Sequence, residues 1–164
     1  MIRYSRLLKI SMLVTLLFVP ARLYSVPQTA SDVKVSGSLK PDKVKRGGAT
    51  QGTIAIEIPN GLHLQSNKPL DKFLVPTKLD IEAPQGLKIG PALYPRARVV
   101  KLSFSKTPVA VYEGLAVIRF NVSVPASFGA SSAEIKGRLR FQACNNEACF
   151  PPQTREIKIG LSVE

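Results

Sequence analysis

The feature that most constrains this sequence is a two-residue alternation of apolar and polar side chains. The alternation recurs along the chain, whereas no apolar stripe at helical spacing lasts three turns after Val26. Alternation of this kind is typical of strands that bury one face and expose the other to water. The clearest runs predict strands at Thr53–Ile58, Ala116–Val124, Glu134–Phe141 and Ile157–Leu161.

Weaker strand patterns and turn signals fill the intervals between these runs. The weaker patterns lie at Val33–Leu39, Thr77–Ile81, Val99–Phe104 and Val109–Val111. Gly and Pro punctuate the intervals, as in Pro59-Asn60-Gly61, and the 164 residues include 13 Pro, 11 Gly and no Trp. Roughly seven to nine short strands without helices between them predict an all-β fold, an immunoglobulin-like antiparallel β-sandwich, with a small barrel as the alternative.

The segment Leu62–Pro76 is the least strand-like of the ordered stretches. Four apolar residues within it, Leu64, Leu70, Phe73 and Leu74, are expected to tie it to the core. Connections of this length are uncommon in compact domains, and they are often functional.

The first 25 residues differ in character from the rest. Three basic residues precede the apolar run Ile10–Val19, which Pro20 ends, and Ser25 offers a small residue at a cleavage point. This arrangement predicts a cleaved secretory signal peptide at residues 1–25. A retained membrane anchor is the alternative, but about ten apolar residues fall short of the ~20 needed to span a bilayer. A flexible lead-in at residues 26–31 and one folded domain at residues 32–164 are then expected, because this length supports a single core.

The charge of the chain is strongly positive. There are 23 Lys and Arg against 11 Asp and Glu, and removing residues 1–25 takes away four basic residues and no acid, which leaves a net charge of +8. Such a surface can attract an acidic partner or a phosphate-bearing surface. The basic residues are scattered, with one cluster at residues 40–46, so a solvated basic surface is the simpler interpretation. Because an exported chain rarely meets nucleic acid, no nucleic-acid partner is predicted.

The two cysteines, Cys144 and Cys149, carry the most informative chemistry. The alternation places Phe141 and Ala143 toward the core, so Cys144 is expected to face outward with Gln142 at the end of its strand. A four-residue turn follows, and Cys149 begins the return strand. Directly opposed residues across such a hairpin have Cα atoms ~4.5 Å apart, which is within reach of a disulfide.

The energetics leave the role of such a bond open. A structural disulfide is the simplest interpretation in an oxidising compartment. Closing a loop of about six residues, however, stabilises a fold by only ~2 kcal/mol, and a turn already holds this hairpin together. A bond that restrains so little also suits repeated opening and closing. The residues alone therefore leave a redox role and a structural role equally open.

Other chemistry at these residues has little support. Nothing in the sequence places a helix N-terminus or a close cation beside the thiols, so the pair is expected to exchange poorly until a docked partner activates it. Two cysteines and the only histidine, His63, cannot complete a tetrahedral zinc site, and His63 is expected to be a surface or turn residue. A Cu(I) site of two thiolates is the remaining metal alternative, but no metal and no cofactor is predicted. Motifs for hydrolase or nucleotide-dependent chemistry are missing.

One stretch resembles a known family. The motif Phe141-Gln142-Ala143-Cys144, a short polar loop and Cys149-Phe150-Pro151-Pro152 resemble the active-site hairpin of the N-terminal periplasmic domain of the bacterial thiol:disulfide interchange protein DsbD. The similarity extends over most of the chain after residue 25, with weaker matches at Asn60–Leu64, Ser66–Leu70 and Val111–Gly114.

This resemblance implies an immunoglobulin-like fold, a periplasmic location and a redox role that carries reducing equivalents to periplasmic partner proteins. In that family a membrane-embedded domain and a thioredoxin-like domain supply the electrons. Carried over, Cys144 and Cys149 are the redox pair, and Cys149 is the one that forms mixed disulfides with partners. Because the sequence ends at Glu164, just after the last strand, a separate thioredoxin-like donor is expected.

Two departures from the family pattern matter. The best-known members have one more residue between the cysteines, and they carry an acidic, aromatic cap loop that shields the pair. The corresponding region here, Ala92–Pro108, is longer and contains no acid. Phe104 and Tyr94 are the candidates for a residue that covers the bond.

Two hypotheses follow. The first is an exported, monomeric, single-domain thiol:disulfide interchange protein with protein-disulfide reductase activity and no membrane span after signal cleavage. In it a thioredoxin-like donor reduces the pair, Cys149 attacks a partner disulfide and Cys144 resolves the mixed disulfide. The second hypothesis is a non-catalytic basic β-sandwich binding module whose disulfide is structural.

Overall fold

The computed structural model describes residues 29–164. The predicted signal peptide at residues 1–25 and the start of the predicted lead-in lie outside the described residues. The described chain opens with a short 3₁₀ helix, η1 (Ala30–Asp32), whose Ala30 side chain is buried against the core.

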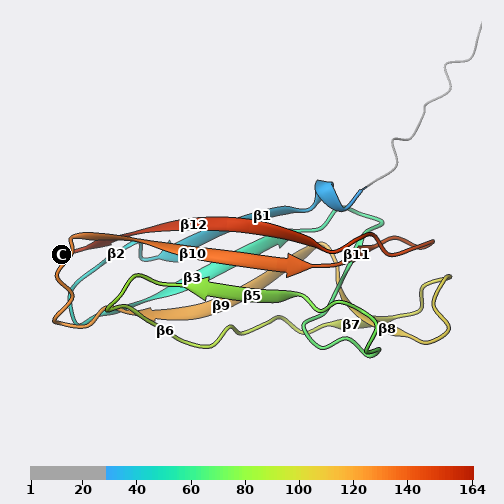
Figure 1. Ribbon diagram of the computed structural model, residues 1–164, viewed down its shortest axis with the longest axis horizontal. Coiled ribbons are helices and arrows are strands. Elements are labelled where there is room, and N and C mark those ends of the chain that lie inside the picture. The colour runs from blue at the N-terminus through green and yellow to red at the C-terminus, as the bar shows by residue number, and fades with distance from the viewer. Residues whose placement is uncertain (1–28) are drawn as a thin grey trace, which may run out of the picture.

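Twelve strands follow, and they form three four-stranded sheets (Figure 1). The first sheet has the order β1-β3-β9-β6, the second β2-β12-β10-β5 and the third β11-β4-β8-β7. All neighbours are antiparallel except β2 and β12. The strands are β1 (Lys34–Lys40), β2 (Lys43–Val44), β3 (Ala49–Glu57), β4 (His63–Gln65), β5 (Lys78–Glu82), β6 (Lys88–Ile89), β7 (Arg98–Val100), β8 (Val109–Tyr112), β9 (Leu115–Ser123), β10 (Ser132–Phe141), β11 (Ala143–Cys144) and β12 (Gln153–Val163).

The first two sheets pack face to face and enclose one main core, which confirms the predicted immunoglobulin-like β-sandwich. The alternation in β9 and β10 works as expected, since every second residue of these strands is buried. In the first sheet Ile54 pairs with Ile118, and both are essentially inaccessible. Ile135 and Leu139 of the second sheet close the core from the opposite side. Burial of such side chains contributes about 1.5–3 kcal/mol each to folding.

The third sheet lies at one end of the sandwich, where the cysteines are (Figure 1). Its strand β8 is buried along its whole length. Tyr112 packs into the main core, whereas Val109 and Val111 belong to a second, smaller apolar cluster on the other face of the sheet. This sheet therefore separates the main core from a small apolar compartment.

The segment Leu62–Pro76 differs from its prediction in two respects. It begins with strand β4, which the sequence pattern did not reveal, and Leu64 of that strand is fully buried as expected. Leu70 and Phe73 were expected to reach the core, but they are 61% and 81% exposed. The reason is that the chain after β4 turns outward, and only Leu74 returns to pack on the smaller cluster.

The close approach of β3 and β9 generates a test of the packing. Gly52 lies opposite Phe120, and a Cβ atom on Gly52 would come within 2.2 Å of the Phe120 ring. Gly52→Ala is expected to lower the free energy of unfolding by about 1–3 kcal/mol, because the ring must leave its place in the core. Urea denaturation measures this change.

The matched control is Gly160→Ala on β12, where an added Cβ meets nothing within 4 Å. This change should leave stability unaltered or raise it by about 0.5–1 kcal/mol, since Gly is unfavourable inside a strand. Equal destabilisation by the two variants would contradict the packing described for Gly52.

Candidate redox site

The hairpin that carries the cysteines forms where the chain changes sheets. Strand β10 ends at Phe141 in the second sheet, and β11 begins two residues later in the third. At the transition the Gln142 carbonyl accepts a hydrogen bond from the Gln65 N–H at 3.0 Å. The Gln142 side chain accepts from the Val75 N–H at 3.0 Å and donates to the Phe150 carbonyl at 3.3 Å. Gln142 thus ties the hairpin to β4 and to the segment after it.

The turn between the cysteines is closed by Asn145. Its side-chain Oδ1 accepts hydrogen bonds from the backbone N–H groups of Glu147 and Ala148, each at 2.8 Å. Its own N–H donates to the Ala148 carbonyl at 2.9 Å. An Asn that binds its own following backbone is a common turn device, so four residues suffice to reverse the chain.

Cys144 and Cys149 face each other across this turn and form a disulfide, with Cα atoms 3.9 Å apart. The two cysteines pair across the hairpin as expected, but their Cα atoms are closer than the expected ~4.5 Å. The two sulfur-bearing residues differ in exposure: Cys144 has no accessible surface, whereas Cys149 is half-buried. Cys149 is therefore the more exposed residue of the pair.

The burial of Cys144 corrects the sequence-based expectation that it faces outward. The alternation assigned its direction properly, because Ala143 points to the main core and Cys144 to the opposite side. That opposite side is not solvent, however. It is the smaller apolar compartment, in which Cys144 packs with Leu102, Val109 and Val111. A second layer over the outer face of a strand cannot be deduced from alternation within that strand.

Leu102 is the covering residue that sequence reasoning missed. It is 2% exposed and lies in the cluster with Cys144, while Leu74 and Val100 pack against the same cluster. The adjacent Ser103 hydroxyl donates a hydrogen bond to the Asn146 carbonyl, which joins the loop after β7 to the cysteine turn.

Neither candidate cover from the sequence occupies that position. The Tyr94 hydroxyl accepts the Leu79 N–H at 2.8 Å, and its ring packs on the main core. Phe104 is 38% exposed and is not among the residues of the smaller cluster. The strand expected at Val99–Phe104 is also shorter than predicted, because β7 ends at Val100 and the chain turns there.

Gln65 is the polar side chain nearest to the disulfide. Its Nε2 lies 3.3 Å from Cys144 Sγ and 4.0 Å from Cys149 Sγ, and the residue has no accessible surface. Its side-chain oxygen, Oε1, is buried without a hydrogen-bond partner. The sequence contained one indication of Gln65: it comes two residues after His63, and residues two apart share one face of a strand.

His63 lies directly opposite Cys144 in the pairing of β4 with β11. Its expected place on a surface or turn is wrong, because its side chain is only 14% exposed and its Nδ1 lies 2.8 Å from Glu113 Oε1. Glu113 Oε2 in turn accepts from Arg98 Nη1 at 2.6 Å. Within residues 29–164 no group of three His, Cys, Asp or Glu side chains could hold a metal ion.

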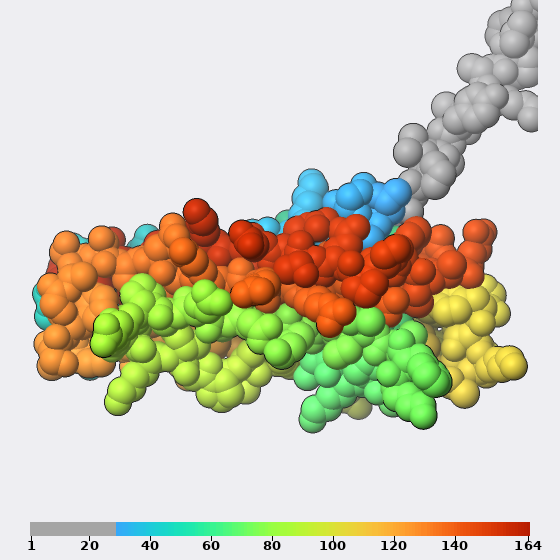
Figure 2. All heavy atoms as spheres, viewed as in Figure 1, coloured from blue at the N-terminus to red at the C-terminus, as the bar shows by residue number. Residues whose placement is uncertain are grey.

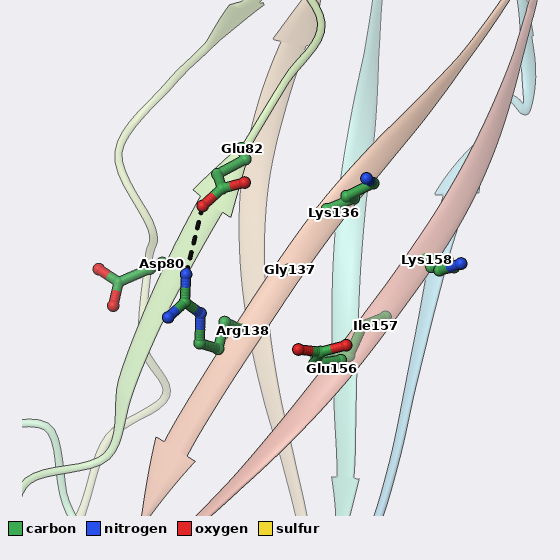
Figure 3. A pocket seen from close by; sticks show the side chains of 8 residues that line it. All are labelled: Asp80, Glu82, Lys136, Gly137, Arg138, Glu156, Ile157 and Lys158. Atoms are coloured by element: carbon green, nitrogen blue, oxygen red, sulfur yellow. Dashed lines mark hydrogen bonds and ion pairs between the residues drawn. The ribbon is translucent and has the colours of Figure 1, made fainter.

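Other polar features of residues 29–164 lack redox chemistry. A hollow of about 300 Å³ on the second sheet is lined by charged residues of both signs from β5, β10 and β12, and Arg138 pairs there with Glu82 at 3.3 Å (Figure 3). Opposite charges on adjacent strands are typical of a solvated sheet face.

Burial raises the pKa of Tyr112, whose hydroxyl donates to Asn67 Oδ1 at 2.6 Å, so this phenol stays protonated near neutral pH.

These features define a class: an immunoglobulin-like sandwich that carries a short-loop disulfide, with one cysteine fully buried and the other half-buried, on a hairpin at its end. The family model described as "Thiol:disulfide interchange protein DsbD, N-terminal" matches residues 36–161. The chain therefore belongs to this family, as its cysteine hairpin had indicated. Family membership and the disulfide together support thiol:disulfide interchange at the family level.

A solved structure shows the same fold. The N-terminal periplasmic domain of ScsB from Proteus mirabilis has a TM-score of 0.53 at 11% identity, with 83% of this chain and 49% of that chain covered. This chain thus spans about half of that domain's length. The DsbD N-terminal domain of Neisseria meningitidis in its reduced form has a TM-score of 0.44 at 20% identity, covering 68% and 77% of the two chains. No curated protein sequence matches the chain, and none of the helices in residues 29–164 has the length and apolar character to cross a bilayer.

The cover over Cys144 generates a prediction about access to the bond. Leu102→Ala is expected to lower the free energy of unfolding by about 2–5 kcal/mol. It should also speed reduction of the native disulfide by dithiothreitol several-fold, because the compartment around Cys144 opens. Release of free thiol in the folded protein measures the rate.

Leu161→Ala is the matched control, since Leu161 is equally buried on β12 in the main core. It should cost a similar amount of stability without changing the rate of reduction. An equal acceleration in the two variants would mean that the faster reduction comes from general destabilisation, not from loss of the cover.

Proposed function

We propose that Cys144 and Cys149 are the redox pair of an exported thiol:disulfide interchange protein, which passes reducing equivalents from a thioredoxin-like donor to periplasmic partner proteins. The observation that carries the proposal is the unequal burial of the two sulfur-bearing residues. Exchange requires in-line access of a thiolate to one sulfur, and only the Cys149 side offers it. Cys149 is therefore the residue that forms mixed disulfides, and Cys144 resolves them.

The energetic cost of opening the bond supports this role. The disulfide closes a loop with a sequence separation of 5, and Asn145 already holds that loop by three hydrogen bonds. A loop this short contributes only ~2 kcal/mol to stability on the chain-entropy model. Reduction therefore leaves the sandwich folded, as a protein that cycles between two redox states requires.

The surface around the hairpin supports docking of a protein partner. Two loops flank the disulfide, the segment 66–76 and the region Ala92–Pro108, and Figure 2 shows parts of both, green and yellow, at the same end as the red cysteine turn. Five large apolar side chains on these segments are exposed: Leu70, Phe73, Leu93, Val99 and Phe104. Leu93 differs from the other four because it pairs with Arg119 in the middle of β9, in the first sheet. Exposed apolar side chains around an accessible reactive group are typical of an interaction site.

The charge of this surface indicates the character of the partner. The region Ala92–Pro108 contains four basic residues and no acid, and the segment 66–76 contains two lysines and one aspartate. Lys72 lies over the Phe73 ring with its Nζ 5.2 Å from the centroid. A partner that presents acidic residues around its own cysteine pair fits such a surface, because complementary charge steers association.

Trapping of mixed disulfides tests the assigned roles. Cys144→Ala leaves Cys149 without its resolving partner, so covalent complexes with disulfide-bearing partner proteins should accumulate. Non-reducing electrophoresis with mass spectrometry detects them. Cys149→Ala is the control, and it should yield far less complex because Cys144 is buried. Equal trapping by both variants would contradict the assignment, and no trapping by either would contradict the redox role.

The alternative is a binding module whose disulfide is structural. A structural bond is expected to have a reduction potential below about −300 mV, whereas a redox-active one falls in the range of roughly −270 to −120 mV. Under the structural alternative, the double variant Cys144→Ser, Cys149→Ser should keep partner binding and function.

The docking surface generates a prediction of its own. Phe73→Ser should lower kcat/KM for reduction by a thioredoxin-like donor several-fold, because an exposed aromatic anchor is lost. Reduction by dithiothreitol, which needs no docking, should not change. Leu93→Ser is the control, since Leu93 is 62% exposed but pairs with Arg119 in the middle of β9, in the first sheet and not in the third sheet that carries the hairpin. A loss of similar size for Leu93→Ser would contradict a role for this surface.

A further inference from the structure

Gln65 is held beside the disulfide by its own backbone. Its N–H donates to the Gln142 carbonyl at 3.0 Å, and its carbonyl accepts the Thr77 hydroxyl at 2.5 Å. These bonds fix β4 against the cysteine hairpin. The side chain then directs its amide nitrogen at Cys144 Sγ, 3.3 Å away, in a site without solvent access.

The amide oxygen of Gln65 has no partner in this oxidised state. A buried amide oxygen without a donor is unfavourable, and native folds contain few such atoms. The hydrogen-bond contacts of the amide nitrogen are with the two disulfide sulfurs. Neither can satisfy the oxygen, because a disulfide carries no proton to donate.

Reduction to the thiol provides a donor for the Gln65 amide oxygen, which has none in the disulfide form. A thiol at Cys144 has an S–H that can donate to an amide oxygen, and a thiolate there is a better acceptor for the amide N–H than a disulfide sulfur is. A glutamine amide offers both a donor and an acceptor, and a rotation about its last bond exchanges them. Gln65 can therefore bind Cys144 in either protonation state of the reduced protein, through its oxygen to the thiol or through its nitrogen to the thiolate. The N–H bond to the charged thiolate is stronger than the N–H contact to the disulfide sulfur, and the disulfide offers the oxygen no donor.

We propose that Gln65 is a positioning residue that biases the Cys144–Cys149 pair toward its reduced form and directs attack to Cys149. This inference rests on the proposed redox function of the pair. It adds a residue outside the cysteine motif that sets how readily the bond opens and which sulfur leaves.

Reduction of the pair by a donor dithiol takes two exchange steps. A donor thiolate attacks Cys149 Sγ, a bond forms between the donor sulfur and Cys149, and the Cys144–Cys149 bond breaks. The electron pair goes to Cys144 Sγ, which becomes a thiolate beside the Gln65 N–H and then takes a proton from solvent. The second thiol of the donor, as its thiolate, attacks the donor sulfur of the mixed disulfide and releases Cys149 as a thiolate, which is protonated in turn. Two electrons and two protons reach the pair, and the donor dithiol becomes a disulfide.

The test measures the equilibrium between the dithiol and disulfide forms of each variant in a glutathione redox buffer. Gln65→Met keeps the length of the side chain and removes both amide atoms. It is expected to shift the equilibrium constant toward the disulfide by about tenfold, equivalent to ~30 mV for a two-electron couple. The free energy of unfolding should fall for the reduced protein, which loses a hydrogen bond to Cys144. It should hold or rise for the oxidised one, which loses an unsatisfied oxygen and only a weak contact to sulfur. Gln65→Leu serves as the second variant if Gln65→Met does not fold.

Gln142→Leu is the matched control, since Gln142 is also a glutamine of the hairpin region but its amide binds backbone groups of Val75 and Phe150. It should destabilise both redox states alike and leave the equilibrium with glutathione unchanged. An unchanged equilibrium in Gln65→Met, or an equal shift in Gln142→Leu, would overturn the inference. A failure of the proposed function would be seen in a different experiment. The wild-type protein would then not exchange with a thioredoxin-like partner, and the glutathione titration contains no such partner.

Discussion

The transfer of the chain from one sheet to another at Gln142 is the constraint on which the site depends. Up to Phe141 the strand β10 belongs to the sandwich and follows its alternation. The backbone bond between Gln65 and Gln142 then draws the next residues into the third sheet. Because this sheet has an apolar compartment on its outer face, a residue that would otherwise meet water is enclosed. The unequal burial of Cys144 and Cys149 follows from this one transfer of the chain between sheets.

The compartment around Cys144 combines two properties that oppose each other. Its apolar wall of Leu102, Val109 and Val111 excludes water and disfavours a charged thiolate. The Gln65 amide adds a polar group to the same space, and its nitrogen points at Cys144 Sγ, the leaving group of the proposed exchange. The buried disulfide is protected as long as no partner is docked. The Gln65 N–H nevertheless lies beside the sulfur on which negative charge would develop during the proposed exchange. Burial protects the bond, and the half-buried Cys149 gives a docked protein access to it.

Much of this fold could be predicted from the sequence, and the failures share one physical cause. Strands β3, β9, β10 and β12 are long and bury one face, so their period was visible. Strands β4 and β11 have only three and two residues, too few to display a period. Leu70 and Phe73 were assigned to the core because they are apolar, but an apolar side chain can also serve a surface that binds another protein. In each case the missing information was the neighbour that the segment meets in space.

The sequence by itself determined the class of fold, the position of the cysteine hairpin and the family, because each depends on local patterns: alternation, turn residues and a short motif around Cys144 and Cys149. Tertiary structure alone decided which sulfur is enclosed, that Leu102 covers it and that Gln65 reaches it. Gln65 and Cys144 are 79 residues apart in the chain. Contacts over such a separation arise from the pairing of strands in different parts of the sequence, and no local pattern contains them.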